Sequence, residues 1–335
     1  MSLHASTEPL IAKYDVAILD LDGVVYRGAH AIPHAVEAIR YARGAGVRVA
    51  YVTNNASRTA AEVASQIRGF GLDVDDTDVV TAGEAIAHIV AESVPAGSPV
   101  LVVGGPGLTV PLESFGLKCV TSADDRPVAV VQGFHPDVGW RNLAEASYAI
   151  QAGAAWFASN ADLTVPTDRG TAPGNGSLVA AVRRATGAEP VVAGKPERGL
   201  FDETVRRTGA SRPLMVGDRL DTDIVGAVNA GIDGLHVLTG ISRLGHLVAQ
   251  PAGKRPQYVA RDLRALFLPH PPVTVDGGRV VCDDAVVDLD ERGDVRLTRG
   301  DPGSLAALRA VVTAAWQGLD QTGQVPRLIG AALEH

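Results

Sequence analysis

Residues 14–28 read Tyr14-Asp-Val-Ala-Ile-Leu-Asp20-Leu-Asp22-Gly23-Val-Val-Tyr-Arg-Gly28. The apolar run at 16–19 leads directly into two aspartates and a glycine. Such a run is typical of a strand buried on both faces of a parallel sheet, and open α/β sheets bind their ligands at the carboxyl ends of these strands. Two carboxylates there are costly to hold together unless a cation or a proton transfer requires them. We therefore expect a magnesium-dependent site centred on Asp20.

The composition favours a folded protein. The chain has 335 residues, of which 46% are hydrophobic, and a net charge of −8, which argues against nucleic acid or an anionic membrane as the main partner. Its two cysteines, Cys119 and Cys282, lack metal-ligand spacing and suggest ordinary buried thiols in a reducing compartment. Residues 1–10 show no signal-peptide pattern, and no apolar run reaches about 18 residues. These features predict a cytoplasmic protein without membrane insertion.

Apolar runs of strand length alternate with helical patterns along most of the chain, as in a parallel sheet. The spacing Thr59-x-x-Glu62 indicates a capping box at the start of a helix. A Gly/Pro-rich loop is expected at 162–176, and the runs at 191–193, 214–216 and 235–237 are assigned to the core sheet. We expect an α/β fold: a doubly wound, Rossmann-like core (12–83 and 187–268), an inserted α/β cap (84–186) and a small C-terminal α+β appendage (273–335).

Polar residues suited to phosphoryl transfer follow four of the expected core strands: Asp20 with Asp22, Thr53, Lys195, and Asp218 with Asp223. One carboxylate can act as a nucleophile, and a second, two residues on, as an acid and base. A lysine and a hydroxyl neutralise and orient phosphoryl oxygens, and further aspartates are hard ligands for Mg²⁺. Each signal alone has a plainer explanation, such as a turn, a helix cap or an exposed loop lysine. Their common position at strand ends favours the chemical interpretation.

These motifs resemble those of a known family. The segments Asp20-Leu-Asp-Gly-Val, Val52-Thr-Asn-Asn, Gly194-Lys-Pro and Gly217-Asp-Arg-Leu-Asp-Thr-Asp-Ile are similar to the four motifs of the haloacid dehalogenase superfamily of phosphatases. The stretches Ala158-Ser-Asn-Ala-Asp and Gly170-Thr-Ala-Pro-Gly-Asn-Gly-Ser-Leu resemble the signature of its C2a-capped members. Those members include phosphoglycolate, glycerol-3-phosphate, pyridoxal phosphate and 4-nitrophenyl phosphatases. The resemblance covers residues 12–268.

The resemblance implies a Mg²⁺-dependent phosphomonoester hydrolase that forms an aspartyl-phosphate. Asp20 would be the nucleophile and a metal ligand, and Asp22 the acid/base, with its backbone carbonyl on the metal. Asp218 would be a direct ligand, and Asp223 would hold the metal shell. Thr53, Asn54 and Asn55 would bind the phosphoryl group, and Lys195 would pair with its charge.

The substrate is expected to be a small phosphorylated metabolite chosen by the cap, because the core sees only the phosphate. The cap loop at 162–171 would contact the leaving group, through Asp162, Val165 and Arg169. The family's marker for a pyridoxal ring is a histidine in this loop, which here reads Leu163-Thr-Val-Pro166. We favour glycerol 3-phosphate. Pairing of Arg169 with a second anion would favour 2-phosphoglycolate, and a solvated loop arginine is the plain alternative.

Three other functions fit the sequence less well than phosphatase activity does. A phosphomutase would carry a small helical cap between the first two motifs, where residues 24–52 leave too little room. A non-hydrolytic, receiver-like phosphoacceptor would be much shorter and would lack Asp22. Arg327-x-x-Gly330-x-Ala332 fits an acetyltransferase pyrophosphate loop, but the appendage is too short for that fold. We expect it to be non-catalytic and to serve docking, with homo-oligomers through it or the cap.

Overall fold

The computed structural model describes residues 3–167, 169–290 and 292–330. The chain forms two compact units: Met1–Ala50 with Thr208–His335, and Tyr51–Arg207. Each unit is described by itself. The boundaries expected from the sequence for core, cap and appendage stay a prediction.

The core sheet has the expected α/β character. β1, β13, β14 and β15 run parallel, with Ile18 of β1 opposite Met215 of β13. β4 runs parallel to β5, and the division between the units passes through β4. In spatial order the strands are β15 (Tyr258–Ala260), β14 (Asp233–Val237), β13 (Pro213–Gly217), β1 (Val16–Asp20), β4 (Arg48–Thr53) and β5 (Val79–Thr81).

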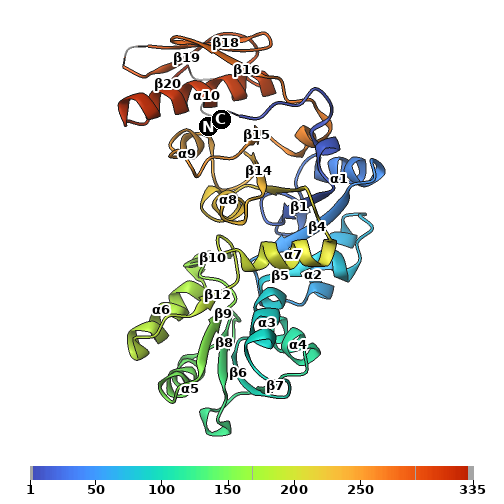
Figure 1. The fold of residues 1–335 in the computed structure, drawn as a ribbon, viewed down its shortest axis with the longest axis vertical. Coiled ribbons are helices and arrows are strands. Elements are labelled where there is room, and N and C mark those ends of the chain that lie inside the picture. The colour runs from blue at the N-terminus through green and yellow to red at the C-terminus, as the bar shows by residue number, and fades with distance from the viewer. Residues whose placement is uncertain (1–2, 168, 291, 331–335) are drawn as a thin grey trace. The chain divides into compact units, whose positions relative to one another are not determined.

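Helices separate these strands along the chain, which confirms the doubly wound, Rossmann-like class (Figure 1). The capping box is present: the Thr59 side chain accepts from the Glu62 amide, and the Glu62 carboxylate accepts from the Thr59 amide. A similar box, Thr81 with Glu84, starts α3. The helices are α1 (Ala35–Gly44), α2 (Ala60–Gly69), α3 (Ala82–Ser93), α7 (Gly199–Thr208), α8 (Val225–Ala230) and α9 (Leu244–Val248).

The unit Tyr51–Arg207 contains a second parallel sheet, with helices between several of its strands. Leu101, Val130 and Trp156 contribute to its apolar core. Its strands, in spatial order, are β12 (Val191–Val192), β9 (Ala155–Ala158), β8 (Ala129–Gln132), β6 (Pro99–Val103) and β7 (Lys118–Val120). The helices between the strands of this sheet along the chain are α4 (Pro106–Ser114), α5 (Trp140–Gln151) and α6 (Asn175–Thr186).

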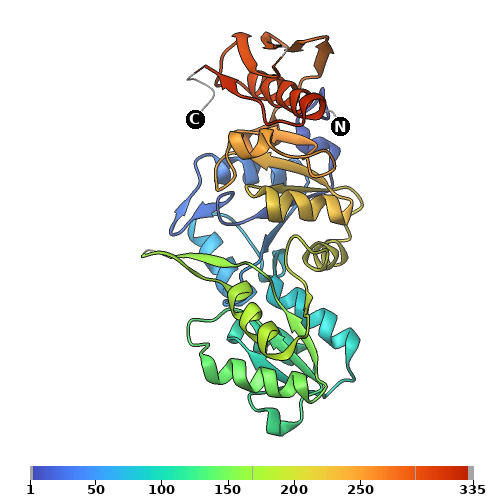
Figure 2. The ribbon, with the colours of Figure 1, turned by 90° about the vertical axis from the view of Figure 1, so that its left-hand side faces the viewer.

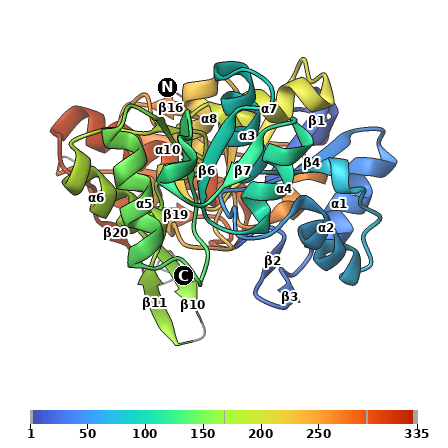
Figure 3. The same ribbon diagram turned by 90° about the horizontal axis from the view of Figure 1, so that it is seen from below.

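Two expectations about this unit were wrong. The run at 191–193 is not a buried strand of the core sheet: β12 pairs with β9 at the edge of the second sheet, and Val191 is exposed. A short Val-Val-Ala run does not reveal which sheet pairs with it. The expected loop at 162–176 contains an antiparallel hairpin, β10 (Thr164–Thr167) with β11 (Gly170–Pro173) (Figure 3). Pro166 and Gly170 weaken the strand pattern there.

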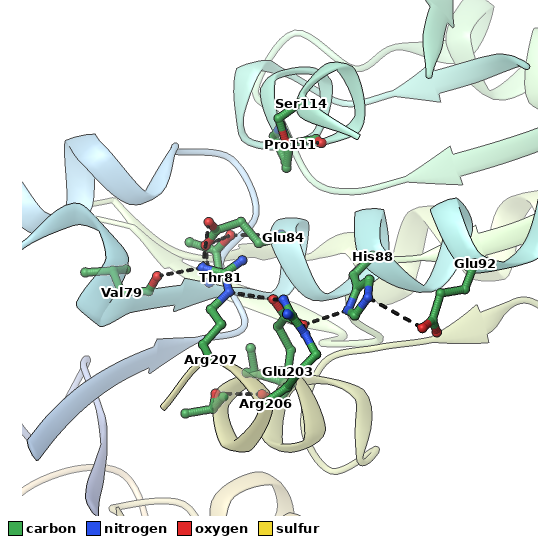
Figure 4. Close-up of polar contacts among 12 residues, drawn as sticks. Val79, Thr81, Glu84, His88, Glu92, Pro111, Ser114, Glu203, Arg206 and Arg207 are labelled. Carbon is green, nitrogen blue, oxygen red and sulfur yellow. Dashed lines mark hydrogen bonds and ion pairs between the residues drawn. The ribbon is translucent and has the colours of Figure 1, made fainter. Parts of the chain in front are cut away.

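An ion cluster around the buried Glu203 fastens α7 to α3. The Glu203 carboxylate accepts hydrogen bonds from Arg206 and Arg207 and contacts the His88 ring, and Arg207 also pairs with Glu84 (Figure 4). Burial by itself would raise the pKa of Glu203, but the two arginines outweigh it and hold that pKa below its ordinary value. The cluster therefore stays ionised and fixes the helix that follows Lys195.

The C-terminal layer, residues 273–330, consists of a sheet and one helix (Figure 2). Its first three strands are antiparallel, and α10 begins after its N-cap Ser304. Ala332 of the Arg327-x-x-Gly330-x-Ala332 pattern lies outside the described residues. The elements are β16 (Val273–Asp276), β17 (Arg279–Cys282), β18 (Ala285–Leu289), β19 (Val295–Arg299), α10 (Leu305–Thr322) and β20 (Leu328–Ile329).

Arg309 of α10 joins this layer to the rest of its unit. Its guanidinium is buried and donates to the carbonyls of Pro271 and His4 at 3.0 and 2.7 Å, and it lies 3.3 Å from Nδ1 of His270. His270 Nε2 lies 3.1 Å from the Ala265 carbonyl. Because arginine only donates and a carbonyl only accepts, His270 is neutral, with its proton on Nε2. Burial, with Arg309 beside it, lowers the pKa of His270 to about 4.

We predict that His270→Gln makes stability less sensitive to acid. The pKa of His270 is about 4 in the folded state against 6.5 ordinarily, so the unfolded chain binds more protons between these values. Stability therefore falls as pH drops from about 7 towards 4. Between about pH 7 and pH 5, the free energy of unfolding of the variant should fall by about 1–2 kcal/mol less than that of the wild type. Urea unfolding at both pH values measures this, and equal losses would contradict it.

Candidate active site

Three aspartates converge in the unit that contains β1 and β13. Asp20 is the last residue of β1, and Asp218 follows β13, its parallel neighbour. Asp223 lies in the short π-helical turn Leu220–Ile224. All three are buried, and one carboxylate oxygen from each lies within 4.8 Å of the others. The structure thus brings together three of the four aspartates that the sequence selected in the core motifs.

Glycines make room for this cluster. A Cβ on Gly23, whose φ is +86°, would lie 2.7 Å from Cγ of Asp218. A Cβ on Gly217 would lie 2.2 Å from the Cβ of Asp223. The Asp223 carboxylate also accepts the Arg219 amide at 3.0 Å. The Asp-Gly and Gly-Asp pairs read from the sequence are therefore steric requirements of the carboxylates as well as turns.

A loop that the sequence analysis did not select, residues 239–243, encloses Asp218. The Ile241 amide donates to Oδ2 of Asp218 at 2.7 Å, and the Ser242 amide donates to the Asp218 carbonyl at 3.1 Å. A Cβ on Gly240 would lie 1.8 Å from Oδ2 of Asp218. At the other end, the Thr239 hydroxyl donates to the Gly23 carbonyl at 2.5 Å. The loop thus contacts both the Asp218 carboxylate and the residue after Asp22.

Ser242 itself is held from two sides. Its hydroxyl accepts the Leu220 amide at 3.1 Å. Its carbonyl lies 3.1 Å from Nε2 of His236, which is completely buried. Burial lowers the pKa of His236 to about 4, so near neutral pH the ring is uncharged and donates from Nε2 to this carbonyl. The loop at 239–243 is therefore fixed at several backbone positions.

Asp22 differs from the other three aspartates because it is exposed. It lies just beyond β1 and forms a β-bridge with Tyr26. The Gly23 amide donates to the Tyr26 carbonyl at 2.8 Å, which closes the turn under Asp22. An exposed carboxylate at the edge of a buried cluster is suited to exchanging protons with solvent and substrate.

The donor set fits a hard divalent cation. Three buried carboxylates at this distance repel one another strongly, and a cation among them relieves that repulsion. Oxygen-only ligands are the set that Mg²⁺ prefers, with water completing the octahedron. Asp20, Asp218 and Asp223 are therefore a candidate metal centre.

The second group of selected residues lies in the unit Tyr51–Arg207. Thr53 ends β4, and its hydroxyl accepts the Asn55 amide at 3.1 Å. The Asn55 side chain accepts both the amide and the hydroxyl of Ser57, at 2.8 and 2.7 Å. Thr53 and Asn55 thus shape the turn that follows β4, as Asx-type turns do.

Asn54 binds two other selected residues. Its Oδ1 accepts the Lys195 amide at 2.8 Å, and its Nδ2 donates to the Lys195 carbonyl at 2.9 Å. The same Nδ2 lies 3.2 and 3.3 Å from the two carboxylate oxygens of Asp162. Lys195 is buried. The structure therefore brings Asn54, Lys195 and Asp162 together.

Asn160 and Asn175 complete this network, and sequence reasoning gave neither a role. Asn160 donates to the Asn54 carbonyl at 2.7 Å and accepts the Asp162 amide at 3.1 Å. Asn175 donates to the Asn160 carbonyl at 2.7 Å. Both lie within the stretches that resemble the C2a signature, so that resemblance was the available signal. Gly194 is tightly enclosed as well: its Cβ would lie 2.7 Å from the Ser159 carbonyl.

Val165 and Arg169 lie apart from this network along the hairpin. Val165 is partly buried in β10, opposite Ala172. Arg169 is exposed near the hairpin turn, where its amide donates to the Thr167 hydroxyl at 3.3 Å. The structure records no ion pair for Arg169 with the described residues.

Comparison with known proteins identifies the family. Residues 17–118 match the haloacid dehalogenase-like hydrolase family model, and residues 192–266 match a related HAD-hydrolase-like model. The chain is a haloacid dehalogenase-like hydrolase. It is 42% identical over 308 residues to a D-glycerol 3-phosphate phosphatase from Mycobacterium tuberculosis, covering 91% of this chain and 86% of that one. It is 35% identical to an acid sugar phosphatase from Staphylococcus aureus, covering 75% of this hydrolase and 96% of that protein.

Solved structures agree with this assignment. A glycerol phosphate phosphatase from Mycobacterium tuberculosis, crystallised in complex with magnesium, matches the hydrolase with a TM-score of 0.83 at 41% identity. The match covers 93% of each chain. A p-nitrophenyl phosphatase from Archaeoglobus fulgidus matches with a TM-score of 0.71 at 28% identity, over 76% of this chain and 98% of that one.

We predict that Gly240→Ala weakens cation binding by the hydrolase. The added methyl group would lie 1.8 Å from Oδ2 of Asp218, so the carboxylate must move. A change in the surroundings of a metal ligand typically costs about 10–100-fold in affinity, and we expect a loss of this size for Mg²⁺, measured by calorimetry. Gly245→Ala is the matched control, because nothing lies within 4 Å of its Cβ position. Equal affinities for the two variants would contradict the prediction.

Proposed function

We propose that this hydrolase is a Mg²⁺-dependent phosphatase that acts on glycerol 3-phosphate through an aspartyl-phosphate. The observation that carries the proposal is the convergence of buried Asp20, Asp218 and Asp223 at the ends of paired parallel strands. It occurs in a chain that is 42% identical to a D-glycerol 3-phosphate phosphatase.

In the proposed mechanism the two carboxylates of the first motif have different tasks. An oxygen of Asp20 attacks phosphorus while the ester P–O bond breaks, and Asp22 gives its proton to the departing alkoxide. Asp22 then takes a proton from water, which attacks phosphorus, releasing phosphate and restoring the Asp20 carboxylate. Asp20, the Asp22 carbonyl and Asp218 would hold Mg²⁺, with Asp223 supporting its shell, and the bound ion would supply positive charge for the phosphoryl oxygens. Burial of Asp20 and exposure of Asp22 support this division.

Lys195 and Thr53 are proposed to bind the phosphoryl group. A buried ammonium group and a hydroxyl stabilise negative charge without reorganisation during the reaction. Asn54 and Asn55 contribute by shaping the segments that carry these groups: Asn54 binds the Lys195 backbone, and Asn55 forms the turn after Thr53. We therefore assign both asparagines to positioning within the phosphate site.

Substrate choice is proposed to depend on the cap loop. Asp162, held by Asn54 and by the Asn160 side chain, supplies a carboxylate that can accept hydrogen bonds from a polyol. Val165 and Arg169 would contact the leaving group from the hairpin. A hydroxyl-bearing alcohol such as glycerol suits this acceptor better than a second carboxylate would, which favours glycerol 3-phosphate over 2-phosphoglycolate.

The proposal includes a cytoplasmic location and self-association through the cap or the C-terminal layer. Both cysteines are free thiols, which suits a reducing compartment. No helix in the described part of the chain has the length and apolar character needed to span a membrane. Trp140 and Tyr148 of α5 are exposed, and large aromatic side chains are enriched at protein interfaces.

The decisive experiment measures phosphate release from both enantiomers of glycerol 3-phosphate, with 2-phosphoglycolate and pyridoxal phosphate for comparison. We expect glycerol 3-phosphate to give the highest kcat/KM and EDTA to abolish turnover. Asp20→Asn should lower kcat by about 10⁴-fold or more, because it removes the nucleophile. Turnover retained by Asp20→Asn would refute the mechanism, and a single phosphorylation without turnover would favour a receiver-like phosphoacceptor.

A separate prediction concerns Asn54. Asn54→Ala leaves the buried backbone N–H and C=O of Lys195 without the partners they have here. Each such loss costs about 1–3 kcal/mol, so kcat/KM should fall by about 10–100-fold. Ser57→Ala is the control, because its hydroxyl donates to Asn55 within the same turn and not to the Lys195 backbone. If the two variants had the same kcat/KM, Asn54 would have no positioning role.

A further inference from the structure

The C-terminal layer contacts the unit that holds the three aspartates through α10. This helix packs against β17 and β18 on one side and against α9 and β15 on the other (Figure 1). Its apolar residues, including Val311 and Trp316, belong to one buried cluster with Leu244, Leu247 and Val248 of α9. The layer therefore shares a core with α9 instead of forming a core of its own.

Polar contacts fix α9 to α10 more specifically than this packing does. Nε1 of Trp316 donates to the Leu247 carbonyl at 2.9 Å, in a buried position. Arg255 donates to the Gln250 carbonyl at 2.9 Å, just beyond α9, and makes a two-pronged pair with Asp320 at 2.6 and 2.7 Å. The Arg255 guanidinium also lies over the Trp316 ring, 5.0 Å from its centroid. The Leu247 carbonyl is thus bound by Trp316 of α10, and the Gln250 carbonyl is bound by Arg255, which Asp320 of α10 holds.

The start of α9 continues directly from the loop at 239–243. In that loop the Ile241 amide donates a hydrogen bond to the Asp218 carboxylate, and the Ser242 amide donates one to the Asp218 carbonyl. Since α9 has only the five residues Leu244–Val248, a displacement of its end is transmitted to this loop over little more than one helical turn.

Apolar packing also connects the three aspartates to α10. Leu220 and Ile224 are the first and last residues of the turn that carries Asp223, and both belong to the buried cluster that contains Trp316 and Leu247. Two independent connections, one through backbone hydrogen bonds and one through side-chain packing, therefore join α10 to the segments that carry Asp218 and Asp223.

We propose that the C-terminal layer is a positioning element of the metal centre, with Trp316 as the positioning residue that fixes α9 and, through the loop at 239–243, the Asp218 carboxylate. Its role is to hold this carboxylate for the cation before the cation arrives. The inference rests on the proposed function, because it takes the three aspartates to be a Mg²⁺ site.

Removal of the Trp316 hydrogen bond should weaken Mg²⁺ binding. Groups that directly orient a metal ligand are worth about 10–100-fold in affinity, and Trp316 acts one step further away, so we expect about a 3–10-fold rise in the Mg²⁺ dissociation constant. The change is Trp316→Phe in the full chain, which keeps an aromatic ring in the core but removes the N–H donor. Isothermal calorimetry with Mg²⁺ alone measures it without reference to turnover.

The matched control is Val287→Ala. Val287 is buried in β18 of the C-terminal layer and belongs to the same apolar cluster as Trp316, but it makes none of the contacts to α9 described above. It should lower the free energy of unfolding by about 1–3 kcal/mol and leave the Mg²⁺ dissociation constant unchanged. If both variants weaken Mg²⁺ binding in proportion to their loss of stability, the layer acts only as general support and the inference is wrong.

Hydrogen exchange provides the second readout. In Trp316→Phe without metal, amides of residues 239–248 should exchange faster, by about the same factor as the affinity loss, while those of β17 and β18 keep their wild-type rates. Unchanged exchange at 239–248, or an unchanged dissociation constant, would overturn the inference. Failure of the wild-type hydrolase to bind Mg²⁺ would instead refute the proposed function, so the two failures are distinguishable.

Discussion

The constraint on which the active-site unit depends is the mutual repulsion of three buried carboxylates. Asp20, Asp218 and Asp223 place oxygens within 4.8 Å of one another. Like charges at this distance in a poorly solvated site favour protonation or separation. The fold opposes both by fixing the backbone that carries each group, so that a divalent cation finds its ligands in place.

Backbone amides hold the carboxylates in place, and glycines leave the space that the carboxylates occupy. Asp218 is bound by the Ile241 amide and Asp223 by the Arg219 amide. Gly23, Gly217 and Gly240 leave space that a single methyl group would fill. An amide donor stabilises a carboxylate without adding a titratable group to the site. Neutral His236 extends this arrangement to Ser242.

The sequence predicted what local patterns determine. Apolar runs that end in Asp20, Thr53 and Asp218 mark strand ends, and the Thr59–Glu62 box lies within one helical turn. It did not predict the loop at 239–243 or the sheet to which β12 belongs, because both depend on partners distant in the chain. Asn54 shows the same limit: its position in the motif was evident, but its contacts with Asp162 and Lys195 arise only in the folded unit.

The residues that we propose to bind phosphate follow the same design as the three aspartates of the candidate metal centre. Asn54 binds the amide and carbonyl of Lys195, and Asn160 binds the backbone of both Asn54 and Asp162. Lys195 is thus held through its main chain by a neutral side chain from another segment, and Asp162 is held through its amide by Asn160, two residues before it. Such a neighbour can be tied to any part of the fold without altering the charge of the site. This explains how a C-terminal layer without reactive groups at the centre can still contribute to it, through the Leu247 carbonyl of α9.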